Sequence, residues 1–137
     1  MLNDNTQPGH EGLGVGLESL ASVVIDAGLK VHQALGPGLL ESAYEHCLLH
    51  ELSLRGVAAR RQVPLPINYR GTALDVGYRL DIVVEDAIII EIKSAEAHSR
   101  LYEAQLTTYL RLSGHRLGFL MNFNVPLFKQ GLRRFVI

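Results

Sequence analysis

The sequence has few of the features that mark membrane proteins, disulfide scaffolds or nucleotide-binding loops. It contains one cysteine, Cys47, so no internal disulfide can form, and we expect a reducing, cytoplasmic location. No apolar run approaches the ~20 residues that a membrane-spanning helix needs. Residues 1–16 lack the basic and apolar regions of a secretory signal, and we expect a flexible, disordered arm or a cloning remnant there. Internal repeats, low-complexity segments and a glycine-rich loop after a strand are also missing from the sequence.

Size and composition favour a single ordered domain. The chain has 137 residues, of which 47% are hydrophobic and 20% charged, and we expect one domain over residues 17–137. The net charge of −1 does not favour binding to nucleic acid through overall charge. However, residues 1–59 carry two basic and seven acidic side chains, whereas residues 60–137 carry eleven and seven. The basic half suits a phosphate-bearing substrate, although a neutral domain can show the same asymmetry.

Hydrophobic periodicity predicts alternating helical and extended segments. Apolar residues at spacings of three and four predict helices over residues 17–35, 38–56 and 98–113. Alternation and β-branched residues predict strands over residues 73–84, 87–93, 117–123 and 132–137, with a loop framed by Pro126 and Gly131. The strand predicted over residues 60–71 contains Pro64 and Pro66, which place it at a sheet edge.

The two later helices have predicted buried faces. For the second helix these residues are Leu40, Ala43, Tyr44, Cys47, Leu48 and Leu52. For the third they are Leu101, Ala104, Leu106 or Thr108, Tyr109 and Leu112.

Residues 78–94 form the most informative segment, because isolated charges lie within two apolar strands. A two-residue loop between these strands would send Asp81 and Glu91 to opposite faces. A three-residue loop, residues 85–87, instead places Asp81 opposite Glu91 and Arg79 opposite Lys93. A bulge would have the same effect. In that register one face carries the apolar residues Leu80, Ile82, Val84, Ile88, Ile90 and Ile92.

Two interpretations of the charged face remain open. Opposed carboxylates repel one another unless a cation or a proton lies between them, and magnesium prefers one or two carboxylates with water and phosphate oxygens. Lys93 would then orient or deprotonate a water, or stabilise a phosphoryl oxygen. In the second interpretation, Arg79, Asp81, Glu91 and Lys93 form a solvated ladder of ion pairs.

An Asp, a spacer of about ten residues and Glu-x-Lys on an apolar strand resemble the core of the PD-(D/E)xK nuclease superfamily. The residues are Leu80-Asp81 and Glu91-Ile92-Lys93, with Leu80 at the position of the superfamily proline. The resemblance implies an α/β fold with a mixed sheet of four to five strands flanked by helices. It further implies Mg²⁺- or Mn²⁺-dependent hydrolysis of nucleic acid, with DNA favoured over RNA and the choice between them left open. Asp81, Glu91 and the Ile92 carbonyl would hold the metal, and Lys93 would position the attacking water.

Gly38, Glu41 and Tyr44 spell the Gly-x-x-Glu-x-x-Tyr motif, and the chain resembles the small bacterial GxxExxY proteins over residues 17–137. The resemblance implies that Glu41 completes the metal shell. On residue grounds alone, Glu41 can equally be a surface residue that compensates the helix dipole.

Gln105 and Tyr109 lie four residues apart on one helix face. Gln-x-x-x-Tyr after Glu-x-Lys resembles the RecB-like branch of the superfamily, which implies that this pair lies beside the active site and orders Lys93 or the scissile strand. Taken singly, a capped amide and a core tyrosine explain them as well.

Several other groups have two interpretations. Lys129, Arg133 and Arg134, together with Arg79, would grip phosphates, but a strand edge guarded by charge explains the terminal pair equally well. His46 and His50, four residues apart with Cys47 beside them, suggest a zinc site, but the Glu of a His-Glu-x-x-His arrangement is absent and a third ligand is not evident. Exposed helix residues are the simpler interpretation.

A second hypothesis keeps the fold and drops the reaction. The chain would then be a non-catalytic subunit that binds nucleic acid or a protein partner, because a chain of this size has no room for a separate recognition module. Either hypothesis is compatible with a homodimer or with a separate recognition partner.

Overall fold

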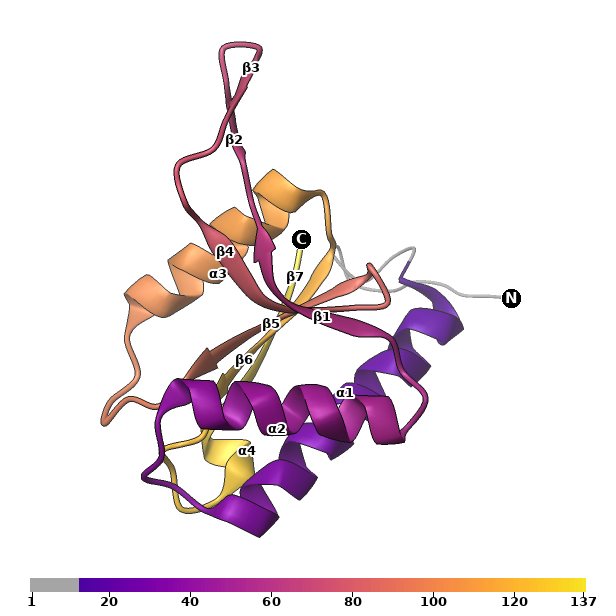
Figure 1. The fold of residues 1–137 in the computed structure, drawn as a ribbon, viewed down its shortest axis with the longest axis vertical. Helices are drawn as coiled ribbons and strands as arrows, with labels where there is room; N and C mark the ends of the chain where they lie inside the picture. The colour runs from indigo at the N-terminus through magenta and orange to yellow at the C-terminus, as the bar shows by residue number, and fades with distance from the viewer. Residues whose placement is uncertain (1–12) are drawn as a thin grey trace.

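The computed structural model describes residues 13–137, and Figure 1 shows a central sheet with helices on both of its faces. The elements are α1 Gly14–Leu35, α2 Glu41–Leu54, β1 Ala59–Pro64, β2 Ile67–Tyr69, β3 Thr72–Leu74, β4 Arg79–Val84, β5 Ile88–Lys93, α3 Arg100–Ser113, β6 Leu117–Asn122, α4 Phe128–Gly131 and β7 Leu132–Val136. Strands β1, β4, β5, β6 and β7 form one sheet in that order. Its β5–β6 pair is parallel and the other pairs are antiparallel. The predicted mixed sheet flanked by helices is therefore confirmed, with five strands.

Two hydrophobic clusters hold the layers together. The larger one joins α1, α2 and α4 to one face of the sheet, with Tyr44, Leu48, Phe119 and Phe123 among its buried members. The smaller one lies under α3, with Leu106 and other residues packed against the opposite face. Because both faces are covered, the central strands β5 and β6 are buried along almost their whole length.

The predicted apolar face is wrong at Leu80. Its five expected companions belong to the larger cluster, whereas Leu80 lies in the smaller one under α3. The pairing of β1 with β4 skips Gln62 and Asp81, and Gln62 has a φ of 53°. The pleat is interrupted at this point, so the alternation of faces does not continue across it.

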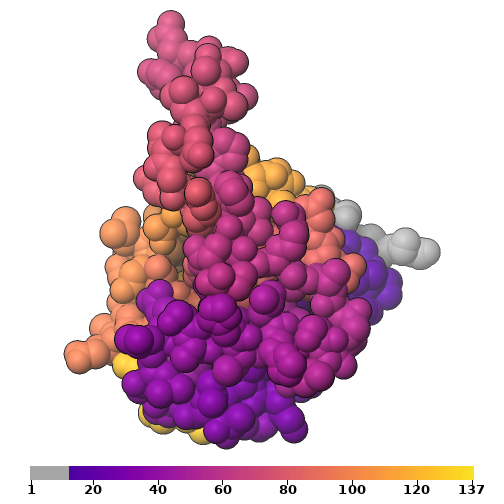
Figure 2. Space-filling model, in the orientation of Figure 1, coloured from indigo at the N-terminus to yellow at the C-terminus, as the bar shows by residue number. Residues whose placement is uncertain are grey.

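The strand predicted over residues 73–84 is also wrong, because it is two strands. β3 ends at Leu74, and β4 begins at Arg79. Between them the Asp75 carboxylate accepts a hydrogen bond from the Gly77 amide, and Gly77 has a φ of 88°. Within residues 13–137, β3 pairs only with β2, and this two-stranded hairpin projects from the body of the molecule, as Figure 2 shows.

The helices differ in detail from their predicted faces. Leu40 precedes α2 rather than lying inside it, and both Leu40 and Cys47 are exposed, while Glu45 is buried. On α3 the buried residues are Leu106, Tyr109 and Leu110, and both Leu101 and Leu112 are exposed. The short helix α4 falls within a segment that we expected to be a loop.

The first helix begins earlier than expected, since α1 starts at Gly14 and not at residue 17. Residues 1–12 of the expected arm lie outside the described residues, so its flexibility and the division into an arm and one domain stay predictions. None of the helices in residues 13–137 combines the length and the apolar character that crossing a membrane requires.

Candidate active site

Asp81 and Glu91 lie where the pairing of β4 and β5 ends. The paired residues run from Val84 opposite Ile88 to Ile82 opposite Ile90, which is the register of the predicted three-residue loop. Beyond Ile82 the backbone ladder is replaced by a side chain, because the Asp81 carboxylate accepts a hydrogen bond from the Ile92 amide at 2.8 Å. The Asp81 carboxylate is thereby fixed against the Glu-x-Lys segment of β5.

Arg79 does not continue this register toward Lys93. It pairs instead with Pro64 of β1, on the other side of β4. Arg79 forms an ion pair with Asp75 at 4.0 Å and Glu91 is buried, so the four charged residues do not form the solvated ladder of the alternative interpretation. Asp81 and Glu91 are left together, without a basic residue directly between them in the register.

Glu91 is 95% buried, with 5% of its surface exposed. Burial raises its pKa from the usual 4.5 to about 9, and the charge of Asp81 and a hydrogen bond with it act in the same direction. The charge of Lys93 opposes the shift. Near neutral pH, in the absence of a cation, Glu91 therefore keeps a proton beside the Asp81 carboxylate.

The residues present fit a hard divalent cation. The Asp81 and Glu91 carboxyl groups share a proton, and a cation could take the place of that proton between them. The Ile92 carbonyl, next to Glu91 in the chain, could supply a further oxygen ligand. Within residues 13–137 there is no group of three or more His, Cys, Asp or Glu side chains placed to bind a metal. Water and substrate oxygens would therefore have to supply much of the coordination, as is usual for magnesium.

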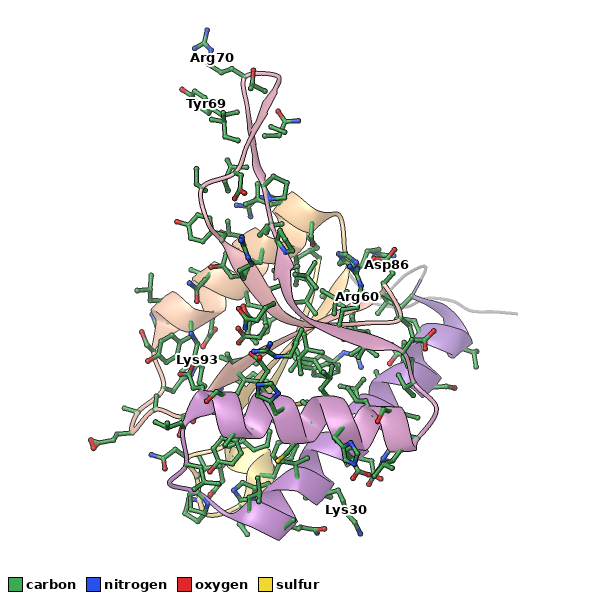
Figure 3. All side chains as sticks on the ribbon, viewed as in Figure 1. Lys30, Arg60, Tyr69, Arg70, Asp86 and Lys93 are labelled. Carbon is green, nitrogen blue, oxygen red and sulfur yellow. The ribbon has the colours of Figure 1, made fainter. Side chains whose placement is uncertain are left out.

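Lys93 is connected to the predicted Gln105–Tyr109 pair. The Lys93 ammonium lies 3.5 Å from the Gln105 side-chain oxygen, and the Gln105 amide donates to the Tyr109 hydroxyl at 3.0 Å. The same ammonium lies 4.6 Å from the centre of the Tyr102 ring. Burial, followed by the charge of Glu91, raises the pKa of Tyr109, so this hydroxyl stays protonated. Figure 3 shows Lys93 between the N-terminal end of α2 and α3.

The Gly-x-x-Glu-x-x-Tyr motif shapes the entry into α2. Gly38 has a φ of 103°, which suits glycine. The buried Tyr44 hydroxyl donates to the Gly36 carbonyl at 2.6 Å and accepts from the Leu39 amide at 3.1 Å. Glu41 is left exposed in the first turn of the helix.

One further contact ties this turn to the site. The Ser94 hydroxyl, directly after Lys93, donates to the Leu39 carbonyl at 2.6 Å. The N-terminal turn of α2, with Glu41, is thereby held next to the end of β5.

Glu45 and Gln62 lie beside Asp81, although the sequence patterns did not identify either as a candidate site residue. Glu45 is buried and accepts hydrogen bonds from Arg61 at 2.7 Å and from the Gln62 amide at 2.8 Å. The nitrogen of the Gln62 side-chain amide also lies 3.5 Å from Oδ1 of Asp81, whereas the Ile92 backbone amide donates to Oδ2. A signal was present, since Glu45 lies three residues before Leu48 and seven before Leu52, on the buried stripe of α2.

The predicted phosphate-binding residues are scattered. Arg134 on β7 is held by both oxygens of Glu18, at 2.6 and 2.9 Å. Arg133 donates to His98 at 3.3 Å, and Lys129 is exposed on α4. Arg79 is the member of this set nearest in sequence to Asp81, and its guanidinium donates to the Tyr78 carbonyl at 3.0 Å.

The side chains of the suggested zinc site, His46, Cys47 and His50, are all exposed on α2. They are not part of a metal-binding cluster within the described part of the chain.

Comparison with known proteins gives one match. The family model described as the PD-(D/E)XK nuclease superfamily matches residues 18–135. Searches of curated proteins and of solved structures gave no match.

Proposed function

Because the chain belongs to the PD-(D/E)XK nuclease superfamily, we propose that it is a metal-dependent nuclease that hydrolyses phosphodiester bonds of nucleic acid, DNA in preference to RNA. The observation that carries this proposal is the position of Asp81 against β5, where its carboxylate lies beside Glu91 and accepts from the amide before Lys93. Paired carboxyl groups next to an ammonium are suited to phosphoryl chemistry with a divalent cation.

In the proposed mechanism, Asp81, Glu91 and the Ile92 carbonyl would hold Mg²⁺ or Mn²⁺, and Glu41, in the first turn of α2, would complete the metal shell through a bound water. The bound metal would polarise the phosphate and lower the pKa of a bound water. Lys93 positions the attacking water through its ammonium group. Gln105 restricts the Lys93 side chain, and Tyr109 in turn fixes the Gln105 amide.

We further propose that the chain is a GxxExxY protein of the RecB-like branch. The connected Lys93, Gln105 and Tyr109 side chains support the branch, and the DNA preference follows from it. The anchoring of Tyr44 beside an exposed Glu41 supports the family motif. A cytoplasmic location rests on the single cysteine. A homodimer or a separate recognition partner would add to the selectivity of the site.

The rival is a non-catalytic subunit that binds nucleic acid or a partner. It is favoured by the lack of a third metal-binding side chain beside Asp81 and Glu91 within the described residues. Such a subunit would bind DNA without metal, with an affinity that falls with salt, and would form no product.

The test is cleavage of labelled linear DNA, circular DNA and RNA with Mg²⁺, with Mn²⁺ or with EDTA. Wild type and Asp81→Ala are compared. Products that require the metal and disappear in Asp81→Ala are the expected result, and the substrate that is cut identifies the class. Binding without any product, with all substrates and both metals, would favour the rival.

A further inference from the structure

An uncharged groove runs along α3 at the foot of the β2–β3 hairpin. It is about 290 Å³ in volume and partly open, and among its lining residues are Ile67, Tyr78, Leu101, Gln105, Tyr109 and Leu112. None of the side chains that line it carries a charge at neutral pH. Leu101 is 72% and Tyr78 46% exposed, so this apolar surface faces solvent. Figure 1 shows the hairpin rising beside α3.

The groove shares two residues with the candidate active site. Gln105 and Tyr109 line the groove and also form the chain of contacts that ends at the Lys93 ammonium. A molecule whose reacting phosphate lay at Lys93 would therefore extend its neighbouring group into the groove.

The chemistry of the walls decides which group fits. Phosphates would need lysine or arginine, which the groove lacks, whereas nucleobases stack on aromatic rings. The groove offers one such ring, Tyr78, which is exposed and is supported from behind by the buried Tyr109 ring, with ring centres 5.9 Å apart at a tilt of 56°. Arg79, next to Tyr78 in the chain, is exposed, and its guanidinium lies 4.0 Å from the Asp75 carboxylate.

From these observations, and resting on the nuclease function proposed above, we propose that the groove binds an unstacked base of single-stranded nucleic acid next to the scissile phosphate. In a duplex the faces of each base are covered by its neighbours and its edge is paired, so the base cannot enter. The enzyme is therefore specific for single strands, for unpaired ends or for flaps, with little dependence on sequence, because every base has an aromatic face.

The test uses fluorescence anisotropy with EDTA present, so that binding is measured without cleavage. The probes are a labelled single strand, a hairpin duplex of the same charge, and the same single strand with abasic sites in place of its bases. The proteins are wild type, Tyr78→Ala and Leu101→Ser. The matched control is Leu54→Ser, since Leu54 is 69% exposed at the end of α2 and is not part of the groove.

We expect wild type to bind the single strand more tightly than the duplex and the abasic strand. Tyr78→Ala and Leu101→Ser should weaken binding of the single strand by about 5- to 150-fold, and Tyr78→Ala should bind the normal and abasic strands alike. Leu54→Ser should behave as wild type.

The proposal is overturned if wild type binds the duplex or the abasic strand as tightly as the single strand. It is also overturned if the groove variants keep full affinity while losing self-association by sedimentation, because the groove would then bind another protein surface. The proposed nuclease function is tested by a different experiment, the cleavage assay, and is refuted if no substrate is cut in the presence of metal. In that case the EDTA experiment still decides what the groove binds.

Discussion

The carboxylate of Asp81 takes the place of a backbone carbonyl as the partner of the Ile92 amide, at 2.8 Å. This contact ends the pairing of β4 with β5 at Ile82 and Ile90 and leaves Glu91 beside an acidic group in a buried position. The same contact both opens the sheet and assembles the candidate metal site. The consequences for stability, metal binding and cleavage can each be measured.

Glu91 should make the metal-free protein less stable as the pH rises. Its folded-state pKa is raised from 4.5 to about 9, so between these values the folded state binds more protons than the unfolded state. The stability that the raised pKa of Glu91 contributes to the folded state is fully present below pH 4.5 and is lost as the pH rises to about 9. Thermal unfolding in EDTA should show a Tm that falls from pH 6 to pH 8.5, and Glu91→Gln should flatten this dependence and gain at least about 4 °C at pH 8.5. An equally steep fall in Glu91→Gln would contradict the assignment.

Metal binding should show the opposite dependence on pH. A cation at Asp81 and Glu91 must displace the proton that Glu91 holds up to about pH 9. Affinity for Mn²⁺, measured by isothermal titration calorimetry, should rise roughly tenfold per pH unit between pH 6.5 and 8. An affinity that is constant over this range would show that the metal binds elsewhere.

The Tyr44 hydroxyl should matter for stability. Tyr44→Phe removes the buried donor to the Gly36 carbonyl and the acceptor for the Leu39 amide. We expect a loss of about 1–3 kcal/mol in the free energy of unfolding, measured with urea. Tyr69→Phe is the control, since Tyr69 is 61% exposed on the hairpin (Figure 3), and it should change the stability by less than about 0.5 kcal/mol. Equal effects of the two changes would contradict this role for the motif tyrosine.

Glu45 should affect cleavage through Gln62. Glu45→Gln replaces the carboxylate that accepts from the Arg61 guanidinium with a neutral amide, which is a weaker acceptor. The same carboxylate no longer holds the Gln62 side-chain amide beside Asp81. We expect the rate of cleavage at saturating metal to fall by about tenfold, which corresponds to the loss of roughly 1.4 kcal/mol. Glu51→Gln, on the same helix and paired with Arg55, should cut at the wild-type rate. If Glu45→Gln also retained that rate, Glu45 would have only a structural role.

Much of the sheet could be predicted from the sequence, as could the proximity of several candidate site residues, because local patterns carry that information. The three-residue loop followed from sorting the charges and the isoleucines of residues 78–94 onto separate faces, and the pairing of Ile82 with Ile90 agrees with it. Gln105 and Tyr109 were predicted to share a face, and their hydrogen bond follows from the spacing of four residues.

Features that depend on contacts between distant segments could not be predicted in this way. Asp81 bonds to the Ile92 amide, and Glu45 reaches Asp81 only through Gln62 on an edge strand. The crossing of Leu80 to the second cluster follows from the break in pairing at Gln62, which no periodicity reveals. Leu101 and Leu112 line the groove and are exposed, contrary to their predicted burial.

The central claim is that Lys93 acts in the reaction and not in holding the metal. The most direct measurement compares wild type, Lys93→Ala and Lys30→Ala, an exposed lysine on α1 (Figure 3), in single-turnover cleavage and in Mn²⁺ binding on the same preparations. We predict that Lys93→Ala lowers the rate of cleavage by at least about 100-fold while its affinity for Mn²⁺ stays within a few-fold of wild type. Lys30→Ala should match wild type in both. Cleavage by Lys93→Ala at the wild-type rate would contradict the account.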